Sequence, residues 1–354
     1  METTEIAPGV TIPRIIRGGW QLADDHGEVD RARALDDIAA FVERGLDTVD
    51  GADIYTGVEL LYGEFNARRR AAGQPGLRVH TKFVPDRSAL GRVDAAYVRG
   101  IVTRSLQRLQ LERLALVQFH WWDYEVPGAV EAAGHLEQLR REGLIDQLGG
   151  TNFDTPHARA LLDAGIGLVS MQVQYSLLDR RPAHALAALG RERGMQLLCY
   201  GTLAGGFISE RWLGVAEPAP GTLANRSLVK YKLVIDEFGG WAAFQKLLNA
   251  LHTIATRHAV SLSTVAVRWV LDQPAVAAAI VGARYADRID DTLQVFGLRL
   301  DGADHALLAP LLAAAPGPAG DTYALERDRN GPHGRIMKYD LNQSPPQAPG
   351  GPLP

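Results

Sequence analysis

The sequence predicts an α/β protein whose eight parallel strands close into a (β/α)8 barrel, the TIM barrel fold. Short apolar segments alternate with amphipathic helical segments along most of the 354 residues. That alternation is typical of a parallel sheet covered by helices on both faces. It repeats eight times, which favours a closed barrel over an open doubly wound sheet. The Gly-x-Gly-x-x-Gly that opens the first helix of a dinucleotide-binding open sheet is absent after the first strand.

The elements follow one another in a regular order. A turn at Ala7-Pro8-Gly9 predicts a small hairpin over residues 5–16, and residues 14–20 predict the first core strand. The remaining strands are predicted at 46–50, 78–83, 114–120, 145–151, 168–175, 196–200 and 277–281. Apolar residues at i, i+3, i+4 and i+7 predict helices. They fall around 35–42 and at 58–70, 94–109, 128–142, 155–163, 182–193, 241–258, 262–272 and 286–296.

The chain divides into one large domain and a tail. Residues 1–316 are predicted to form the single barrel domain, and 317–354 a Pro/Gly-rich C-terminal tail whose last ten or so residues are disordered. The segment 201–240 is far longer than the ~2–6 residues usual for such a loop. Because it carries Phe207, Trp212 and Tyr231, we expect a lid over the barrel mouth, with a disordered insertion as the alternative.

Composition excludes several classes of protein. The formal net charge is −4 with both signs interspersed, which argues against a nucleic-acid-binding face. No apolar run reaches the ~18 residues of a membrane span, and the acidic N-terminus lacks signal-peptide features. The single cysteine, Cys199, cannot form an internal disulfide, so a cytoplasmic location is expected. No His-x-His or His-Glu-x-x-His occurs, and no metal site is predicted.

Polar residues close several of the predicted strands. Asp50, Lys82 and His120 end the second, third and fourth strands, and Tyr55 follows Asp50 by five positions. The carboxyl ends of barrel strands form the working face of this fold. A tyrosine has a reference pKa of about 10, and a nearby ammonium lowers it. Asp50 would keep Lys82 charged, and a neutral His120 could donate a hydrogen bond to a carbonyl oxygen.

This set predicts protonation of a carbonyl oxygen, or the reverse, with Tyr55 as the acid. A carbonyl that is reduced also needs a hydride on carbon. No side chain donates hydride, so a nicotinamide cofactor is implied.

Four motifs carry a resemblance to a known family. They are Asp50-Gly-Ala-Asp-Ile-Tyr55, Thr81-Lys82, Phe119-His120 and Thr151-Asn152-Phe153. From about residue 14 to 300 the chain resembles the aldo-keto reductases, and most of all the branch with aryl-alcohol dehydrogenases and potassium-channel β subunits. The resemblance implies NADP(H)-linked interconversion of aldehydes or ketones with alcohols. Its partner would be a small carbonyl or alcohol substrate, and a homo-oligomer is compatible with the sequence.

The resemblance also assigns binding roles. It implies that Asn152 and Gln172 bond the nicotinamide carboxamide, that Tyr200 stacks on the nicotinamide ring, and that Gly201, Leu203 and Gly205 approach the pyrophosphate. The adenosine end would be held by four residues: Gly282, Arg284, Arg288 and Asp291. Two guanidinium groups there suit a 2′-phosphate, which favours NADP.

Tryptophans follow two of the predicted strands. Trp20 and Trp121 are predicted to line an apolar substrate pocket, and Trp122 is left undecided.

Two other functions stay open from the sequence. A class I aldolase would use Lys82 to form a Schiff base. A redox sensor or regulatory subunit would bind NADP(H) with little turnover. Trapping of a substrate on Lys82 by borohydride would indicate the first, and lack of turnover with a simple aldehyde the second.

Overall fold

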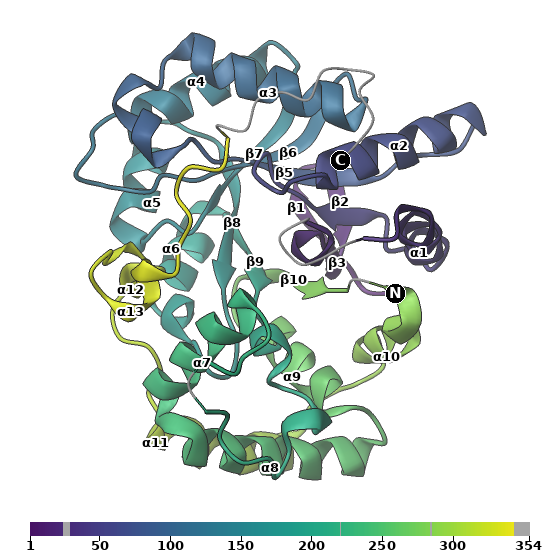
Figure 1. Ribbon diagram of the computed structural model, residues 1–354, viewed down its shortest axis with the longest axis vertical. Coiled ribbons are helices and arrows are strands. Elements are labelled where there is room, and N and C mark those ends of the chain that lie inside the picture. The colour runs from purple at the N-terminus through teal and green to yellow at the C-terminus, as the bar shows by residue number, and fades with distance from the viewer. Residues whose placement is uncertain (24–28, 220, 284, 343–354) are drawn as a thin grey trace.

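In the computed structural model, which describes residues 1–23, 29–219, 221–283 and 285–342, eight parallel strands close into one barrel (Figure 1). Their order around the barrel is β10-β3-β4-β5-β6-β7-β8-β9, so neighbours in sequence are neighbours in space and the last strand pairs with the first. The strands are β3 (Ile15–Gly18), β4 (Thr48–Asp50), β5 (Arg78–Phe83), β6 (Leu114–Phe119), β7 (Ile145–Thr151), β8 (Leu168–Gln174), β9 (Gln196–Tyr200) and β10 (Val276–Gly282). The predicted (β/α)8 barrel is confirmed.

An antiparallel hairpin precedes the barrel. It consists of β1 (Thr3–Ala7) and β2 (Val10–Pro13), with Gly9 at a φ of 75° in the turn. Ile6 and Ile12 are buried with Ile16 and Ile280 in a small cluster. The predicted hairpin is therefore confirmed.

Helices surround the strands on all sides (Figure 1). They are α1 (Arg31–Glu43), α2 (Val58–Ala71), α3 (Ala95–Leu109), α4 (Ala129–Arg141), α5 (Thr155–Asp163), α6 (Ala185–Arg193), α7 (Arg226–Phe238), α8 (Gly240–His258), α9 (Leu262–Leu271), α10 (Ile289–Leu293), α11 (Gly302–Ala314), α12 (Ala324–Arg327) and α13 (Pro332–Arg335). Several begin where a side chain caps the helix: Asp94, Asp154 and Ser261 each accept a main-chain N–H three residues on.

Two predicted helices are broken in the structure. The segment 286–296 contains a short 3-10 turn at each end of α10, at Ala286–Arg288 and Gln294–Phe296. The segment 182–193 opens with a separate turn at Arg181–Ala183, and α6 starts only at Ala185. In both cases the apolar period continues across a change of backbone geometry, which periodicity alone does not reveal.

The tail is ordered over most of its length. From Gly317 to Asn342 it forms a strap that includes α12 and α13 and crosses the molecule beside α6 before rising toward α3 (Figure 1). Residues 343–354, whose larger part was expected to be disordered, lie outside the described residues.

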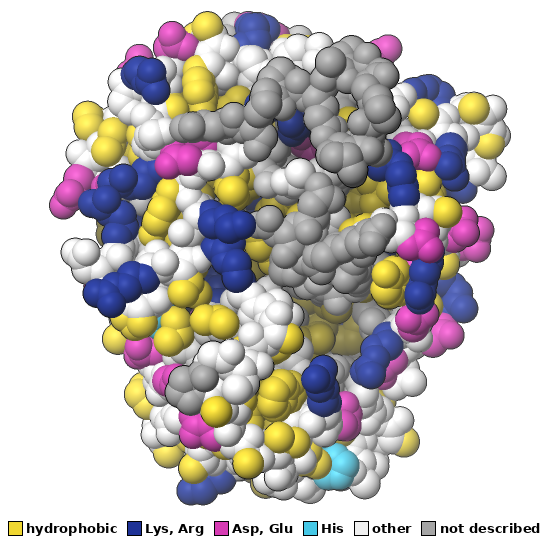
Figure 2. Space-filling view, viewed as in Figure 1, with side chains coloured by type: hydrophobic (Ala, Val, Ile, Leu, Met, Phe, Trp, Pro, Cys, Tyr) yellow, Lys and Arg dark blue, Asp and Glu magenta, His cyan; other side chains and the backbone are white. Residues whose placement is uncertain are grey.

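The surface carries both charges in mixture. On the face drawn in Figure 2, basic and acidic side chains alternate over the described residues without a large area of one sign. Among the described residues, no helix combines the length and the apolar character needed to cross a bilayer.

Candidate active site

A cavity of about 520 Å³ opens at the carboxyl ends of the barrel strands. All four predicted proton-transfer residues line it, from β4, β5, β6 and the loop after β4: Asp50, Tyr55, Lys82 and His120. Segments distant in sequence complete the wall, because α7 and the strap both reach the same mouth. The structure therefore brings the predicted set together.

Asp50 is the centre of a buried polar cluster. Lys82 Nζ donates to Asp50 Oδ1 at 2.7 Å and to the Gly51 carbonyl at 2.8 Å. The Gln172 amide donates to the same Asp50 oxygen at 2.7 Å. Asp50 and Lys82 are 4% and 6% exposed. A buried ion pair with additional hydrogen bonds is held in one geometry, so Asp50 fixes the position of the Lys82 amine.

Tyr55 lies beside this pair. The Lys82 ammonium is 4.8 Å from the centre of the Tyr55 ring, and the Trp20 ring packs on Tyr55 with centroids 5.0 Å apart. Burial, and then the carboxylates of Asp50 and Asp53, raise the pKa of Tyr55 well above its ordinary value. The lowered pKa expected from the sequence is wrong for this arrangement, because burial and the two carboxylates act against ionisation of the phenol. Tyr55 is a phenol that keeps its proton.

His120 is held as a neutral imidazole. Burial, and then the charge of Arg327, lower its pKa to about 3. Its Nδ1 lies 3.0 Å from the Thr151 carbonyl, which can only accept, so Nδ1 carries the ring proton. Nε2 is then an acceptor, and it is buried with no partner among the described residues. The expected donation from neutral His120 to a carbonyl oxygen is wrong for this tautomer.

The residues assigned to the nicotinamide are placed together. Tyr200, Asn152 and Gln172 all line the cavity. The Tyr200 hydroxyl donates to Asn152 Oδ1 at 2.8 Å, and the Gln172 amide nitrogen is bound to Asp50. Asn152 Nδ2 and Gln172 Oε1 form no recorded hydrogen bond with the described residues. One donor and one acceptor in this position match the two halves of a carboxamide.

A glycine-rich turn follows β9. Gly201, Leu203 and Gly205 line the cavity, and both glycines have positive φ, 72° and 64°. A Cβ on Gly201 would lie 2.2 Å from the Tyr231 hydroxyl, and one on Gly205 2.7 Å from the Tyr231 ring. The turn is therefore pressed against α7 and presents bare backbone to the cavity. Together with Tyr200 and the free amide groups, these residues fit a nicotinamide dinucleotide.

The residues assigned to the adenosine end lie further out. Gly282, at the end of β10, lines the cavity, while Arg288 and Asp291 lie outside its lining and Arg288 is exposed. Arg284 falls outside the described residues.

The substrate side of the mouth is aromatic and apolar. Trp20 and Trp122 line the cavity, whereas Trp121 is fully buried, donates to the Val126 carbonyl and packs against Phe119. The assignment of Trp121 to the pocket is wrong. Side chains alternate direction beyond the strand end, so His120 and Trp122 face the mouth and Trp121 faces the helices.

Sequence reasoning missed the wall contributed by the strap and α7. Tyr323, Ile336, Met337 and Leu341 come from the strap, and Lys230 from α7. The length and aromatic content of the 201–240 segment predicted a lid over the mouth, and residues of this segment line the cavity. Nothing in the strap's local pattern indicates which strand ends it reaches.

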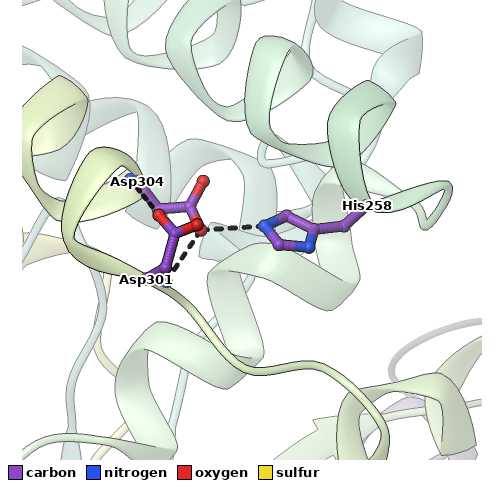
Figure 3. A group of neighbouring side chains, drawn as sticks. All are labelled: His258, Asp301 and Asp304. Carbon is purple, nitrogen blue, oxygen red and sulfur yellow. Dashed lines mark hydrogen bonds and ion pairs between the residues drawn. The ribbon is translucent and has the colours of Figure 1, made fainter.

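A second group of titratable side chains lies away from the mouth (Figure 3). Asp301 caps α11 in a capping box with Asp304, and His258 Nε2 lies 2.8 Å from Asp304 Oδ2. Arg257 pairs with both carboxylates. These contacts join the end of α8 to the start of α11, and they account for the acidic group as a structural one.

The barrel and this site define an oxidoreductase that acts on carbonyl groups with a nicotinamide cofactor. Residues 14–312 match the model of the Aldo/keto reductase family, and the chain belongs to that family.

Known proteins are similar to this chain in sequence, and solved structures are similar to it in fold. The chain is 24% identical over 329 residues to the NADH-specific methylglyoxal reductase of Escherichia coli strain K12, covering 86% of this chain and 96% of that protein. A solved glycerol dehydrogenase from Gluconobacter oxydans is similar in fold, with a TM-score of 0.75, 24% identity, and coverage of 90% of this chain and 98% of that one. An aldo/keto reductase from Klebsiella pneumoniae, solved with NADP and acetate, has a TM-score of 0.66, 21% identity, and coverage of 90% and 97%.

Proposed function

We propose that the chain reduces aldehydes or ketones to alcohols with NADPH, reversibly, and that Tyr55 gives the proton. The observation that carries this proposal is the placement of a half-buried Tyr55 beside the Lys82–Asp50 pair in an apolar, aromatic mouth. When bound over Tyr200, a nicotinamide supplies the hydride.

The side chains of the mouth divide the remaining work. Tyr55 donates its hydroxyl proton to the carbonyl oxygen as negative charge develops there. Lys82, aimed by Asp50, places positive charge near the phenol as it loses that proton. His120 Nε2 accepts a hydrogen bond from the hydroxyl of the product alcohol. In the oxidative direction the substrate hydroxyl must turn its proton to the Tyr55 oxygen, which takes it as hydride leaves the carbon.

The choice of NADPH rests on the predicted pair Arg284 and Arg288, which suits a 2′-phosphate. By its name, the relative from Escherichia coli is specific for NADH, so the two cofactors are compared directly. We expect a lower KM for NADPH than for NADH with the same carbonyl substrate. Equal KM values would remove the 2′-phosphate assignment.

The Lys82 contacts argue against the aldolase alternative. Lys82 Nζ is engaged by the Asp50 carboxylate and the Gly51 carbonyl, so forming a Schiff base would break both contacts and leave the buried Asp50 without its ion-pair partner. The redox-sensor alternative differs from the proposal only in turnover.

Tyr55→Phe is the decisive variant. It removes the donated proton but keeps the ring that packs on Trp20, so turnover of 4-nitrobenzaldehyde with NADPH should fall by about 10²- to 10⁴-fold. Cofactor binding, followed by quenching of tryptophan fluorescence, should stay near wild type. Tyr97→Phe, on α3 and outside the cavity, serves as the control. Retention of most activity in Tyr55→Phe would show that another group is the acid, and a wild type that binds NADPH without turnover would favour the sensor.

A further inference from the structure

One guanidinium of the strap reaches the ends of two barrel strands. Arg327, at the end of α12, donates to the carbonyls of Trp121 at 2.5 Å, Trp122 at 2.8 Å and Asn152 at 2.9 Å. Carbonyls beyond the last residue of a barrel strand have no ladder partner, and here they converge on one cation. A planar guanidinium can serve several acceptors at fixed angles, which an ammonium cannot do as well.

These carbonyls flank the bond that sets the tautomer of His120. Trp121 directly follows His120, and Asn152 directly follows Thr151, whose carbonyl accepts from His120 Nδ1. By joining the next residue on each strand, Arg327 sets the distance between the two partners of that bond.

Asn152 also needs outside support. Its φ is 61°, a left-handed conformation that is less favoured for a residue with a Cβ than for glycine. The Arg327 bond to its carbonyl holds the backbone in that conformation while its side chain accepts from Tyr200. If the backbone of Asn152 left this conformation, the Asn152 side-chain amide, which is assigned to the nicotinamide, would move with it.

Arg327 is itself fixed on several sides. Its guanidinium lies 3.7 Å from the centre of the Tyr124 ring. The preceding residue, Glu326, forms two hydrogen bonds with Arg181 at 3.0 and 3.1 Å, and both side chains are buried. Upstream, Asp321 accepts from the Thr155 main chain at 2.9 Å. The strap is thus held against the barrel by Arg327 and by the two residues named before it, Glu326 and Asp321.

We propose that Arg327 is a positioning residue for carbonyl reduction, holding the ends of β6 and β7 in the arrangement that presents His120 Nε2 and the Asn152 amide to the cavity. The proposal rests on the proposed function for its kinetic consequences, but the geometry of His120 is measurable without turnover. Arg327 does not line the cavity, so it acts through the strand ends and not on the substrate.

The charge of Arg327 favours the neutral form of His120, and its hydrogen bonds favour the position of that neutral ring. The other groups against His120 are the rings of Trp122 and Tyr323, and Asp50, Lys82 and Tyr55 line the same cavity. After burial, Arg327 is the charge that lowers the pKa of His120. Removing this charge should therefore raise that pKa and move the acid side of the pH profile upward.

The test compares Arg327→Met, which keeps much of the side-chain length, with Arg327→Lys and with Arg329→Met. Arg329 is an exposed arginine of the same strap, two residues on, and it forms no hydrogen bond or ion pair with the residues that the structure describes. We expect kcat of Arg327→Met to fall about 10- to 100-fold, the scale of a misplaced reacting group. Fluorescence quenching should show NADPH binding weakened several-fold, and the nitrogen shifts of His120 in ¹⁵N NMR should move away from a single Nδ1–H tautomer.

Arg327→Lys should restore part of kcat, cofactor affinity and the His120 shifts, because it keeps the positive charge but lacks the planar donors of the guanidinium. It also serves as the folded comparison if Arg327→Met does not fold. In Arg327→Ala, added guanidinium should restore activity, whereas it should not alter Arg329→Met. The proposal is overturned if Arg327→Met, or Arg327→Lys where only that variant folds, matches Arg329→Met within twofold in kcat and cofactor affinity with unchanged His120 shifts. If the wild type itself shows no turnover, the proposed function fails, and the His120 tautomer and cofactor affinity still decide the role of Arg327.

Discussion

At the scale of single residues, burial decides how each acid of the mouth behaves. Tyr55 keeps its proton because it lies half-buried near two carboxylates, which raise its pKa, and His120 stays neutral because it is buried near a cation. Both groups are therefore uncharged through the neutral pH range. A site in this state is suited to give a proton to a carbonyl oxygen, since the acid carries its proton.

The buried carboxyl of Asp53 allows the effect of burial on a pKa to be tested through the stability of the protein. Burial, and then the charge of Glu59, raise its pKa to about 7, although the Val84 main chain and the Asn342 side chain donate to it. The folded protein binds the proton more tightly than the unfolded chain, whose aspartate has a pKa of about 3.9. This contribution to stability is complete below pH 4 and is lost as pH rises through about 7, at about 1.4 kcal/mol per unit.

Asp53→Asn removes this titration and keeps one oxygen to accept the two hydrogen bonds. We expect the difference in unfolding free energy, variant minus wild type, to become more positive by about 2 kcal/mol between pH 5 and pH 8. Urea denaturation at both pH values measures it. The exposed Asp36→Asn is the control, and a difference that stays constant with pH would mean that Asp53 is already ionised in the folded protein.

The sequence predicts the residue types of the mouth better than their detailed contacts. Asp50, Lys82 and His120 could be placed because barrel strands end at one face, whatever the helices do. The tautomer of His120 could not be placed, because it depends on the carbonyl of Thr151 on another strand. Trp121 and Trp122 were confused because a shift of one residue reverses the direction of a side chain.

At the scale of elements, the boundaries of strands and helices can be predicted from local sequence. The helices within long insertions were not predicted. β5, β7, β9 and α5 begin and end at the predicted residues because their apolar period stops at a turn or cap. The helix α7 was not predicted, although Asn225 caps it and four residues fall at helical spacing on its buried face, Tyr231, Val234, Ile235 and Phe238. That pattern was available in the sequence. The apolar residues of α11 show no clear face and include Pro310, so its period gives no such signal.

The contact between α7 and the turn after β9 can be tested with one methyl group. Gly201→Ala places a Cβ against the Tyr231 hydroxyl and also forces alanine to a φ of 72°. Gly73→Ala is a matched control, because Gly73 has a φ of 66° with open space around it. Each should lose about 1 kcal/mol for the backbone alone.

Gly201→Ala should lose more than that, because the turn or α7 must shift, and its affinity for NADPH should fall several-fold. Thermal unfolding and fluorescence titration measure the two effects. If the two variants are equally stable and bind the cofactor equally, the turn is not constrained by Tyr231 and takes no part in binding.

At the scale of the whole molecule, the strap covers one side of the mouth of a barrel whose strands are already closed. The barrel is sealed where β10 pairs with β3, so the strap adds no strand. Its contribution is a wall of the mouth and a set of buried polar contacts, chiefly between Glu326, Arg181 and Asp179. Composition predicted a Pro/Gly-rich tail with only its last ten or so residues disordered, and gave no position for the rest. The individual side chains that anchor it carry no periodic signal.

Glu326→Gln tests whether those contacts hold the strap on the barrel. Burial opposes the ionisation of Glu326, but the charges of Arg181 and Lys230 outweigh it and lower the pKa of Glu326 to about 2. The variant leaves the buried Arg181 with Asp179 as its single full ion-pair partner, and removing one member of a buried pair costs about 3 kcal/mol or more. The loss should be constant above pH 5 and shrink as pH falls from about 4 toward 2, where the wild-type carboxylate takes up its proton.

Urea denaturation and limited proteolysis of the strap measure this loss, with the exposed Glu131→Gln on α4 as the control. We expect earlier cleavage within residues 317–342 and lower affinity for NADPH, because Arg327 follows Glu326 directly and loses its anchor. A strap that is cleaved early while Asn152 and His120 keep their wild-type function would show that the mouth does not depend on the tail. Cleavage and cofactor affinity that change together would show that the barrel and its strap form one functional unit.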